Sequence, residues 1–465
     1  MFRRQSSFTV SLAHVWLITL QFIILLFALS CASSIRGKAA NDENTFLDPI
    51  PLPVVRFVVA ADLHYYSRSL GDAGSAFEHD LRKDRKLLLM SAELLDTAIP
   101  RMAAERASFI IICGDMTKDG ERLNHELAAA RLARLASAVP VFVVPGNHDI
   151  ANGLAVRYDG EQRIPVPSIG PEEFKTIYRG LGYGRALDAD QSSLSYVAEP
   201  VHRLWLLALD SCKWRRNKPG KHSETGGCFS RDTERWIEQT LIRARNHGKA
   251  VIVFMHHGVL EHYPHNTQYF SSYLIDDFRR ISRLFARYGV RLVFTGHFHA
   301  QDITVHHFNE RAFLADIETG SLITYPCPYR VVTIEPDRRL RIETRIITAT
   351  SSMQSGFSSY AKEFLLANTA HLIDGYLKRL CVREDQRKLL APRIAKAYLM
   401  HIVGDEPGPD MASIKEGASI GGRCALSIMG KTIAGWQTDF PPSDNNCILD
   451  LTTGYELSVR KSGAQ

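Results

Sequence analysis

The sequence lacks long runs of like charge, internal repeats and low-complexity tracts. Its 465 residues are 45% hydrophobic and 23% charged, a composition that excludes collagen-like and wholly disordered proteins. The formal net charge is only +6, and no tract of five like charges offers a footprint for nucleic acid. We therefore expect a globular protein whose partner is not a nucleic-acid polymer.

Two sequence signatures are also missing, one for a zinc site and one for a nucleotide-phosphate loop. The sequence contains no Cys-x-x-Cys pair with zinc-site spacing and no Gly-x4-Gly-Lys-Ser/Thr phosphate loop. Eight cysteines are present, and setting Cys31 aside leaves seven, so at least one of these is unpaired. Cys212 and Cys228 flank one polar loop. The sequence is compatible with a disulfide between them and equally with two free thiols.

The N-terminus has the pattern of an export segment. Two arginines precede a charge-free stretch over residues 5–35, whose centre at residues 15–29 is apolar. Small residues then lead to Cys31, the position at which a lipoprotein carries its lipid, although an uncleaved anchor has a similar pattern. We predict a signal peptide or membrane anchor over residues 1–34. The protein is then extracytoplasmic, either secreted or held at the membrane by this segment or by a lipid on Cys31.

The region between residues 54 and 347 has the pattern of an α/β fold. Short β-branched runs alternate with amphipathic stretches, which is typical of βαβ units around a largely parallel sheet. After His299 the runs are closed by turns, which predicts a second, more antiparallel sheet. Two packed sheets flanked by helices would result. The predicted strands are 54–61, 109–113, 141–144, 204–209, 250–255 and 291–295, then 303–307, 311–317, 330–334 and 340–347, and the predicted helices are 84–104, 121–138, 232–247 and 274–288.

A helical pattern returns over residues 355–403, where apolar side chains recur three or four positions apart. The remainder from Gly404 reads as loop-rich. We therefore predict an α/β domain over residues 50–349 and a mainly helical C-terminal domain over residues 350–465.

Polar residues follow five of the predicted strands, where they have no use in packing. In α/β sheets the ligand crevice lies outside the carboxyl ends of the strands, so these residues should converge at one place. They are Asp62 with His64, Gly114 with Asp115, the run Gly146, Asn147, His148 and Asp149, the pair His256 and His257, and Gly296 with His297 and His299.

The donor types in these clusters indicate metal ions. Carboxylates, imidazoles and one carboxamide, with no thiolate among them, suit Mn, Fe or Zn. Seven ligands are more than one ion requires, and a shared carboxylate can hold two ions about 3.5 to 4 Å apart, as in-line displacement at phosphorus requires. Asp115 is the candidate for that bridge.

The ordered set of clusters resembles the calcineurin-like metallophosphoesterase family over residues 54–347. The resemblance implies a two-sheet αββα sandwich and two divalent metal ions. One ion would be bound by Asp62, His64, Asp115 and His299, and the second by Asp115, Asn147, His256 and His297.

The same resemblance implies hydrolysis of a phosphate ester by a metal-bridging hydroxide, because binding to a metal ion lowers the pKa of water to about 7. His148 would face the phosphate, beside Asn147, as proton donor. Asp149 would orient the His148 ring, or else cap the segment that follows. One departure is Gly258, which follows His256 and His257 where many family members have proline.

Within the family, the export signal, the tyrosine pair after His64 and the helical C-terminal extension look most like exported bacterial class III cyclic-nucleotide phosphodiesterases. The expected substrate is a 3′,5′-cyclic nucleotide or another small phosphodiester. The same ligands also serve phosphomonoesterases, nucleotidases and phospholipid-headgroup esterases, which stay open as alternatives. A catalytically silent binding module is the other alternative, and its signature would be lost ligands, of which none is missing.

Tyr65 and His262 are further candidates for binding substrate. Tyr65 follows the first ligands, and His262 lies in a polar loop over residues 261–270, so either ring could line the cleft and stack on a base. The alternative is that both are ordinary loop or core residues.

Overall fold

The computed structural model describes residues 45–405 and 410–458. Asp48–Gln465 form one compact unit, and the elements below belong to it. In the described part of the chain, no helix is both long enough and apolar enough to cross a membrane. The predicted export segment at residues 1–34, with Cys31, lies outside the described residues.

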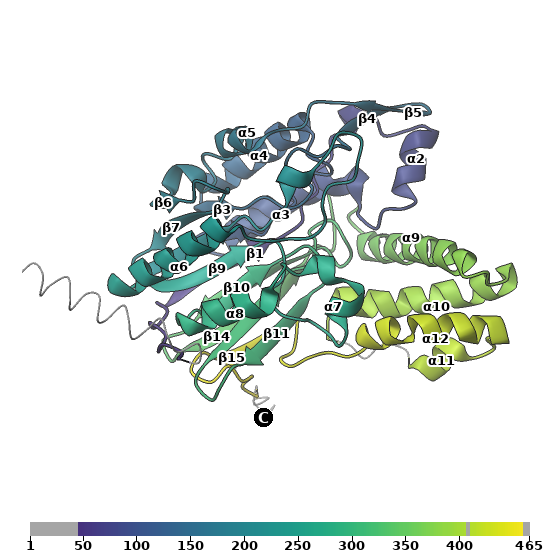
Figure 1. Cartoon of the computed structure of the whole chain (residues 1–465). Coiled ribbons are helices and arrows are strands. Elements are labelled where there is room, and N and C mark those ends of the chain that lie inside the picture. Colours follow the sequence, from purple (N-terminus) through teal and green to yellow (C-terminus); the bar gives the residue numbers. More distant parts are fainter. Residues whose placement is uncertain (1–44, 406–409, 459–465) are drawn as a thin grey trace, which may run out of the picture. The chain divides into compact units, whose positions relative to one another are not determined.

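One sheet has six strands in the order β15-β14-β13-β1-β2-β3 (Figure 1). β1, β2 and β3 run parallel to one another, whereas β13, β14 and β15 are each antiparallel to their neighbours. Every residue of β2 and β3 is buried, as expected of strands that are covered on both faces. The strands are β1 (Val55–Ala60), β2 (Phe109–Ile112), β3 (Val141–Val143), β13 (Pro328–Ile334), β14 (Arg339–Ile346) and β15 (Asn446–Asp450).

The other sheet has seven strands in the order β11-β12-β10-β9-β8-β7-β6. The four strands β8, β9, β10 and β12 run parallel, and the outer strands are antiparallel to their neighbours. The strands are β6 (Asp188–Ala189), β7 (Tyr196–Val201), β8 (Leu204–Leu209), β9 (Ala250–Met255), β10 (Leu292–Thr295), β11 (Asp302–His307) and β12 (Phe313–Glu318), while β4 (Val156–Asp159) and β5 (Gln162–Pro165) form a separate hairpin.

Aromatic side chains join the two sheets at their buried faces. Phe57 of β1 stacks on Phe109 of β2 with ring centroids 4.8 Å apart, and meets Phe294 of β10 edge-on at 5.3 Å. All three side chains are fully buried. This contact couples β1 to β10 across the sandwich, and both strands lead directly into predicted ligands.

Helices cover the outer face of each sheet. Three helices pack against the first sheet through Leu94, Leu132 and Phe174. Two helices pack against the second sheet through Ile237 and Phe285. The predicted αββα fold class is therefore confirmed. The helices are α2 (Ser75–Leu81), α3 (Ser91–Ala104), α4 (Arg122–Ala136), α5 (Pro171–Ile177), α6 (Arg231–Asn246), α7 (Asn266–Tyr269) and α8 (Phe278–Arg287).

The predicted assignment of strands to sheets is wrong in part. β8, β9 and β10 share a sheet with β12 rather than with β1, and β13 pairs with β1 instead of joining a separate sheet. Strands of both sheets are buried and apolar, so hydrophobic pattern alone cannot say which of two sheets a strand joins.

The C-terminal region begins with a helical hairpin of α9 (Phe357–Arg379) and α10 (Glu384–Val403), where the sequence predicts helix. The loop-rich interpretation of the chain after Gly404 is wrong, because α11 (Met411–Lys415), α12 (Ile420–Gly435) and β15 follow. These helices share an apolar cluster that includes Leu377, Ile394 and Leu426. Because β15 pairs with β14, the chain returns to the first sheet after the helices.

Candidate metal centre

The predicted ligands lie in tight turns that follow β1, β2, β3, β9 and β10. Asp62, His64, Asp115, His297 and His299 all have positive φ, between 37° and 79°, a backbone region that side chains other than glycine seldom adopt. Such strained residues cluster at functional sites, where the surrounding structure holds them in place. Two backbone bonds do so here, from the Asp62 N–H to the Gly114 carbonyl at 3.1 Å and from the His64 N–H to the Asp115 carbonyl at 2.9 Å.

The glycines of these turns permit close approach of the loops. A Cβ atom at Gly146 would lie 2.1 Å from Asp115 Oδ1, and one at Gly296 would lie 2.5 Å from Asp62 Oδ2. Any larger residue would therefore push a predicted ligand out of place.

The first ligand group contains Asp62, His64, Asp115 and His299, each offering one donor atom within 4.8 Å of the others. His64 Nε2 lies 3.5 Å from Asp115 Oδ2 and 3.0 Å from His299 Nε2. His299 Nε2 lies 3.4 Å from Asp62 Oδ1.

The second ligand group contains Asp115, His256 and His297. His256 Nε2 lies 3.4 Å from Asp115 Oδ2 and 3.1 Å from Asn147 Oδ1, so Asn147 adjoins the same group. The His256 Nδ1 lies 2.8 Å from the Cys113 carbonyl, to which it donates, and this leaves Nε2 to face the group. The structure thus brings together all seven predicted ligands, with Asp115 common to both groups.

The donor set fits divalent cations. The Asp62 and Asp115 carboxylates are buried, yet within the described residues their ion-pair partners are imidazoles and never Lys or Arg. Asp62 Oδ1 has no hydrogen-bond partner there. Burial lowers the pKa of His64 and of His297 well below the usual value, which keeps both rings in the neutral form that binds metals. Burial is outweighed by Asp115, which raises the pKa of His256 to about 9, so these buried anions favour positive charge, which two metal ions would supply.

His148 lies beside this cluster and is held by a carboxylate. Its backbone N–H donates to Asp115 Oδ1 at 2.9 Å, and its ring meets His64 edge-on with centroids 5.0 Å apart. Its Nδ1 lies 3.0 Å from Asp119 Oδ1, and the other oxygen of Asp119 pairs with Lys118. Asp119 was not among the residues predicted from sequence. Its position four residues after Asp115 in the same loop was a signal that could have identified it.

A family model described as calcineurin-like phosphoesterase matches residues 55–301, just over half of the chain. The chain belongs to the calcineurin-like phosphoesterase family. The predicted family and the predicted enzyme class, a metal-dependent phosphoric ester hydrolase, are confirmed. The identity of the metal among Mn, Fe and Zn stays a prediction, as does ligation by each residue.

Known proteins similar to this phosphoesterase differ in their reactions. A curated probable cyclic nucleotide phosphodiesterase from Moraxella catarrhalis (strain BBH18) is 23% identical over 147 residues, which cover 32% of this chain and 43% of that protein. The match thus spans less than half the length of this relative. A dimetal phosphatase structure from Danio rerio is 16% identical, with a TM-score of 0.45 over 64% of this chain and 97% of that chain. A 5′-nucleotidase structure from Candida albicans SC5314 is 11% identical, with a TM-score of 0.34 over 69% of this chain and 55% of that chain.

In this phosphoesterase Asp149 does not orient His148, so that interpretation is wrong. Its Oδ1 accepts from the Thr117 N–H and hydroxyl, both at 3.1 Å. Its Oδ2 accepts from the N–H groups of Met116 at 3.0 Å and Gly146 at 2.8 Å. Asp149 therefore ties the loop after β2 to the loop after β3, and Asp119 is the carboxylate that orients His148.

Of the two consecutive histidines after β9, His256 faces Asp115 and His257 does not. His257 Nδ1 lies 2.7 Å from Ser211 Oγ, and its Nε2 lies 2.9 Å from the Thr225 carbonyl. A Cβ atom at Gly258 would lie 2.8 Å from a methyl group of Leu274. The packing here therefore favours glycine over the proline that many family members have.

Tyr65 and His262 are both buried, which favours the alternative that they are core residues, and their contact with substrate stays a prediction. The Tyr65 side chain is only 2% exposed and lies under the guanidinium of Arg131, 4.9 Å from the ring centroid. His262 is buried, with Nδ1 2.8 Å from Asp302 Oδ1 and Nε2 3.4 Å from Asp316 Oδ2. Sequence placed both residues near ligands along the chain, but the turn geometry directs their side chains into the core.

We expect His262→Ala to lower the free energy of unfolding by about 3 kcal/mol, because it leaves the buried Asp302 and Asp316 carboxylates without their cation. The KM of the folded enzyme should not change. Denaturant unfolding and steady-state kinetics measure the two effects. A raised KM with unchanged stability would support the substrate-binding role of His262.

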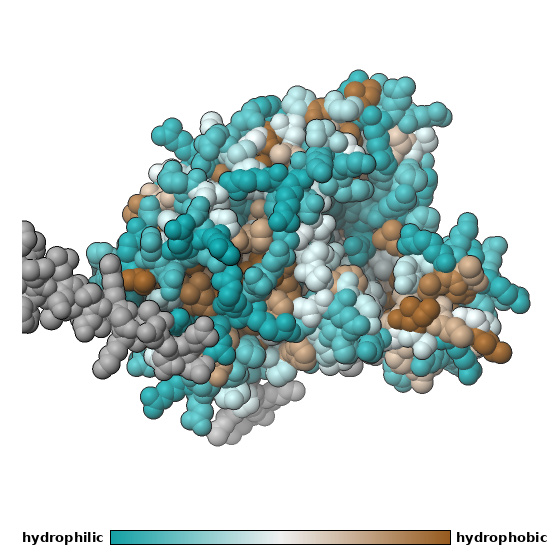
Figure 2. Space-filling view, viewed as in Figure 1, coloured by the Kyte–Doolittle hydropathy of each residue, from teal (hydrophilic) through white to brown (hydrophobic). Residues whose placement is uncertain are grey.

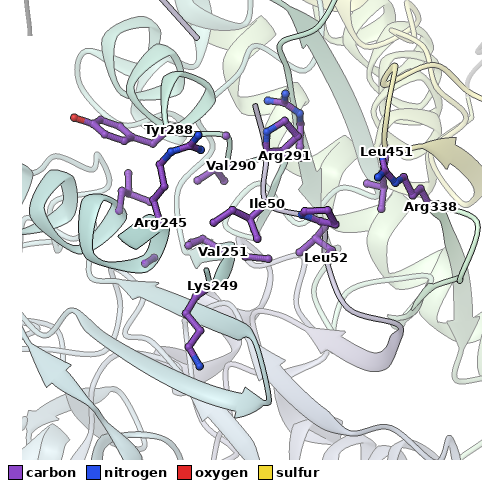
Figure 3. A pocket seen from close by; sticks show the side chains of 16 residues that line it. Ile50, Leu52, Arg245, Lys249, Val251, Tyr288, Val290, Arg291, Arg338 and Leu451 are labelled. Carbon is purple, nitrogen blue, oxygen red and sulfur yellow. The ribbon is translucent and has the colours of Figure 1, made fainter. Parts of the chain in front are cut away.

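Two other features lie apart from the metal centre. The pocket in Figure 3 is a cavity of about 60 Å³, lined by Ile50, Leu52 and residues such as Val251 and Arg291 at the starts of β9 and β10, whereas the ligands follow the ends of these strands.

A Gly-x-Ser-x-Gly string is centred on Ser419, but its Oγ accepts from the Gly422 N–H at 3.2 Å and caps α12. Ser419 therefore stabilises a helix start and is not a nucleophile on a strand-to-helix turn.

The cysteines described are free thiols, Cys212 and Cys228 included, so the disulfide alternative for that pair is not formed in this structure.

Proposed function

We propose that this phosphoesterase hydrolyses small phosphodiesters, with 3′,5′-cyclic nucleotides among them, at the centre built on Asp115. The observation that supports this most is the position of Asp115 Oδ2, 3.5 Å from His64 Nε2 and 3.4 Å from His256 Nε2. A carboxylate shared in this way can hold two ions about 3.5 to 4 Å apart, the spacing used for in-line displacement at phosphorus. The similarity to a protein named as a probable cyclic nucleotide phosphodiesterase supports a diester substrate.

Two divalent ions, when bound, supply Lewis acidity at the phosphoryl oxygens and activate a water molecule. The chain supplies the proton for the leaving oxygen. Burial disfavours a charged His148, but Asp115 and Asp119 outweigh it and raise the pKa of His148 above its usual value. Since Asp119 accepts from Nδ1, the Nε2 atom of His148 is left to donate the proton.

The experiment that tests this function is a substrate panel on protein reconstituted with Mn²⁺, Fe²⁺ or Zn²⁺. We expect kcat/KM for cyclic nucleotides and aryl phosphodiesters to exceed that for nucleoside monophosphates by about 10-fold or more, a difference of about 1.4 kcal/mol in transition-state binding. Preference for monophosphates or phospholipid headgroups would replace the proposal with the corresponding esterase. Silence on every substrate, with both ions bound, would point to a binding module instead.

The proposal includes an extracytoplasmic location, supported by the pattern of residues 1–34. Mass spectrometry of the mature N-terminus distinguishes a cleaved chain, a lipid on Cys31 and an intact anchor. Recovery of the unprocessed chain from the cytoplasm alone would contradict export.

A further inference from the structure

Lys86 is a cation at the edge of the metal centre that neither the ligand groups nor the proton donor include. Its side chain is only 12% exposed, and its ion-pair partner is Asp84, whose Oδ2 lies 3.5 Å from the ammonium. Among the described residues no hydrogen bond uses the Lys86 ammonium, which has three N–H donors. The Lys86 ammonium therefore has N–H donors that remain available to bind a ligand.

The segment that carries Lys86 packs on a turn that supports two predicted ligands. The Leu87 N–H donates to the Ile323 carbonyl at 2.7 Å. In the same turn, the Ser321 hydroxyl donates to the Asp62 carbonyl at 2.8 Å, and Thr324 Oγ1 lies 3.4 Å from His299 Nδ1. Lys86 is thus fixed beside the first ligand group through backbone contacts.

The Lys86 side chain can reach the reacting groups from this position. Its four-carbon stem is flexible and carries the ammonium away from the backbone. The turn on which its segment packs supports both Asp62 and His299, which belong to the first ligand group. A substrate phosphate that contacts the ions would therefore lie within its reach.

Helices of the C-terminal region hold this segment in place. Asn368 of α9 donates from Nδ2 to the carbonyls of Leu81 at 3.1 Å and Asp84 at 2.7 Å. The neighbouring Arg85 guanidinium lies 4.8 Å from the ring centroid of Tyr398 on α10. Figure 1 shows α9 and α10 as a pair at the side of the sandwich on which α2 lies. The helical hairpin thus fixes residues on both sides of the turn that leads to Lys86.

We propose that Lys86 binds a non-bridging oxygen of the substrate's phosphoryl group, and that Asn368 is the residue that positions it. This inference rests on the phosphoesterase function proposed above. It gives the C-terminal helices a role in substrate binding, although they carry none of the predicted metal ligands. Because Lys86 acts through its charge, it contributes more to binding a dianionic phosphate than to binding a monoanionic diester.

The test compares Lys86→Gln with Lys86→Arg and with Lys83→Gln, an exposed lysine three residues away whose ammonium contacts His79. For bis(p-nitrophenyl) phosphate we expect Lys86→Gln to reduce kcat/KM by about 10- to 100-fold through KM, the effect of losing one hydrogen bond to a charged group. The Kd of inorganic phosphate, measured by calorimetry on the metal-loaded protein, should rise by a larger factor. Lys86→Arg should restore part of the loss, and Lys83→Gln should behave as wild type.

Three results would overturn the role of Lys86: unchanged KM and phosphate affinity, an equal loss in Lys83→Gln, or a loss of bound metal in Lys86→Gln. Phosphate affinity is measured without turnover, so it tests Lys86 even if the enzyme is inactive on every ester. Inactivity of the wild type with intact phosphate binding would contradict the proposed function alone.

Asn368→Leu tests the positioning role separately. We expect KM to rise about 3- to 10-fold with kcat and metal content unchanged, because the loss of two hydrogen bonds to the backbone lets the segment shift. In Lys86→Gln the same change should have no further effect on KM, since the residue it positions is gone. Additive effects on KM would contradict positioning of Lys86 by α9.

Discussion

Asp115→Ala should lose both metal ions and reduce kcat/KM by about 1000-fold or more, since metal ions contribute several kcal/mol of transition-state stabilisation. The reason is geometric, because Asp115 belongs to both ligand groups. Removing Asp62 or His256 would affect one group directly, whereas removing Asp115 affects both. Elemental analysis of the purified variant and kinetics on a diester measure the two losses.

A suitable control for this variant is Asp159→Ala, which removes an exposed carboxylate from the β4–β5 hairpin and should leave metal content unchanged. Circular dichroism establishes that each variant is folded. A folded Asp115→Ala protein that keeps two ions per chain, or hydrolyses the diester at the wild-type rate, would contradict the shared-ligand assignment.

The second large effect is expected for His148→Ala, which should retain both ions yet turn over about 100- to 10,000-fold more slowly, the range for loss of a general acid. The loss should be greatest with a poor leaving group, because such a group needs the proton most. Steady-state kinetics on an alkyl and a p-nitrophenyl diester separates the two cases. An unchanged rate with the alkyl ester would reject His148 as the proton donor.

Asp119→Asn provides the matched comparison for His148. It keeps the shape of the side chain at 3.0 Å from His148 Nδ1 but removes the charge that favours the protonated ring. We expect a smaller loss than in His148→Ala, and no further loss when both residues are changed, because they act as one unit. If the rate reductions of the two single variants multiply in the double variant, Asp119 acts on something other than His148.

The metal ligands were predictable because their signals are local. Each lies within a few residues of the end of a buried strand, and the carboxyl ends of parallel strands place side chains at a common edge. His64, Asp115 and His256 could therefore be named without knowing which sheet each strand joins. The helical character of residues 355–403 was readable for a similar reason, since a periodic apolar pattern depends only on nearby residues.

Orientation within a loop was not predictable from position along the chain. Asp149 follows His148 directly, yet its carboxylate turns to four donors on the loops after β2 and β3. His262 lies in a polar loop, yet its ring points to Asp302 and Asp316 on strands that come 40 residues and more later. Hydrogen-bond partners of this kind come from distant segments, and no sequence window contains them.

The sequence by itself determined the family, the α/β class and the set of carboxylates and imidazoles, because these depend on residue type, order and proximity to strand ends. The tertiary structure alone decided how thirteen strands divide between the two sheets, and that Asp119 rather than Asp149 holds His148. It also placed the segment of Lys86 against the turn that supports Asp62 and His299, and β15 beside β14. The physical reason is that such pairings join segments far apart in the chain, and they are selected by the packing of the whole core and the satisfaction of buried polar groups.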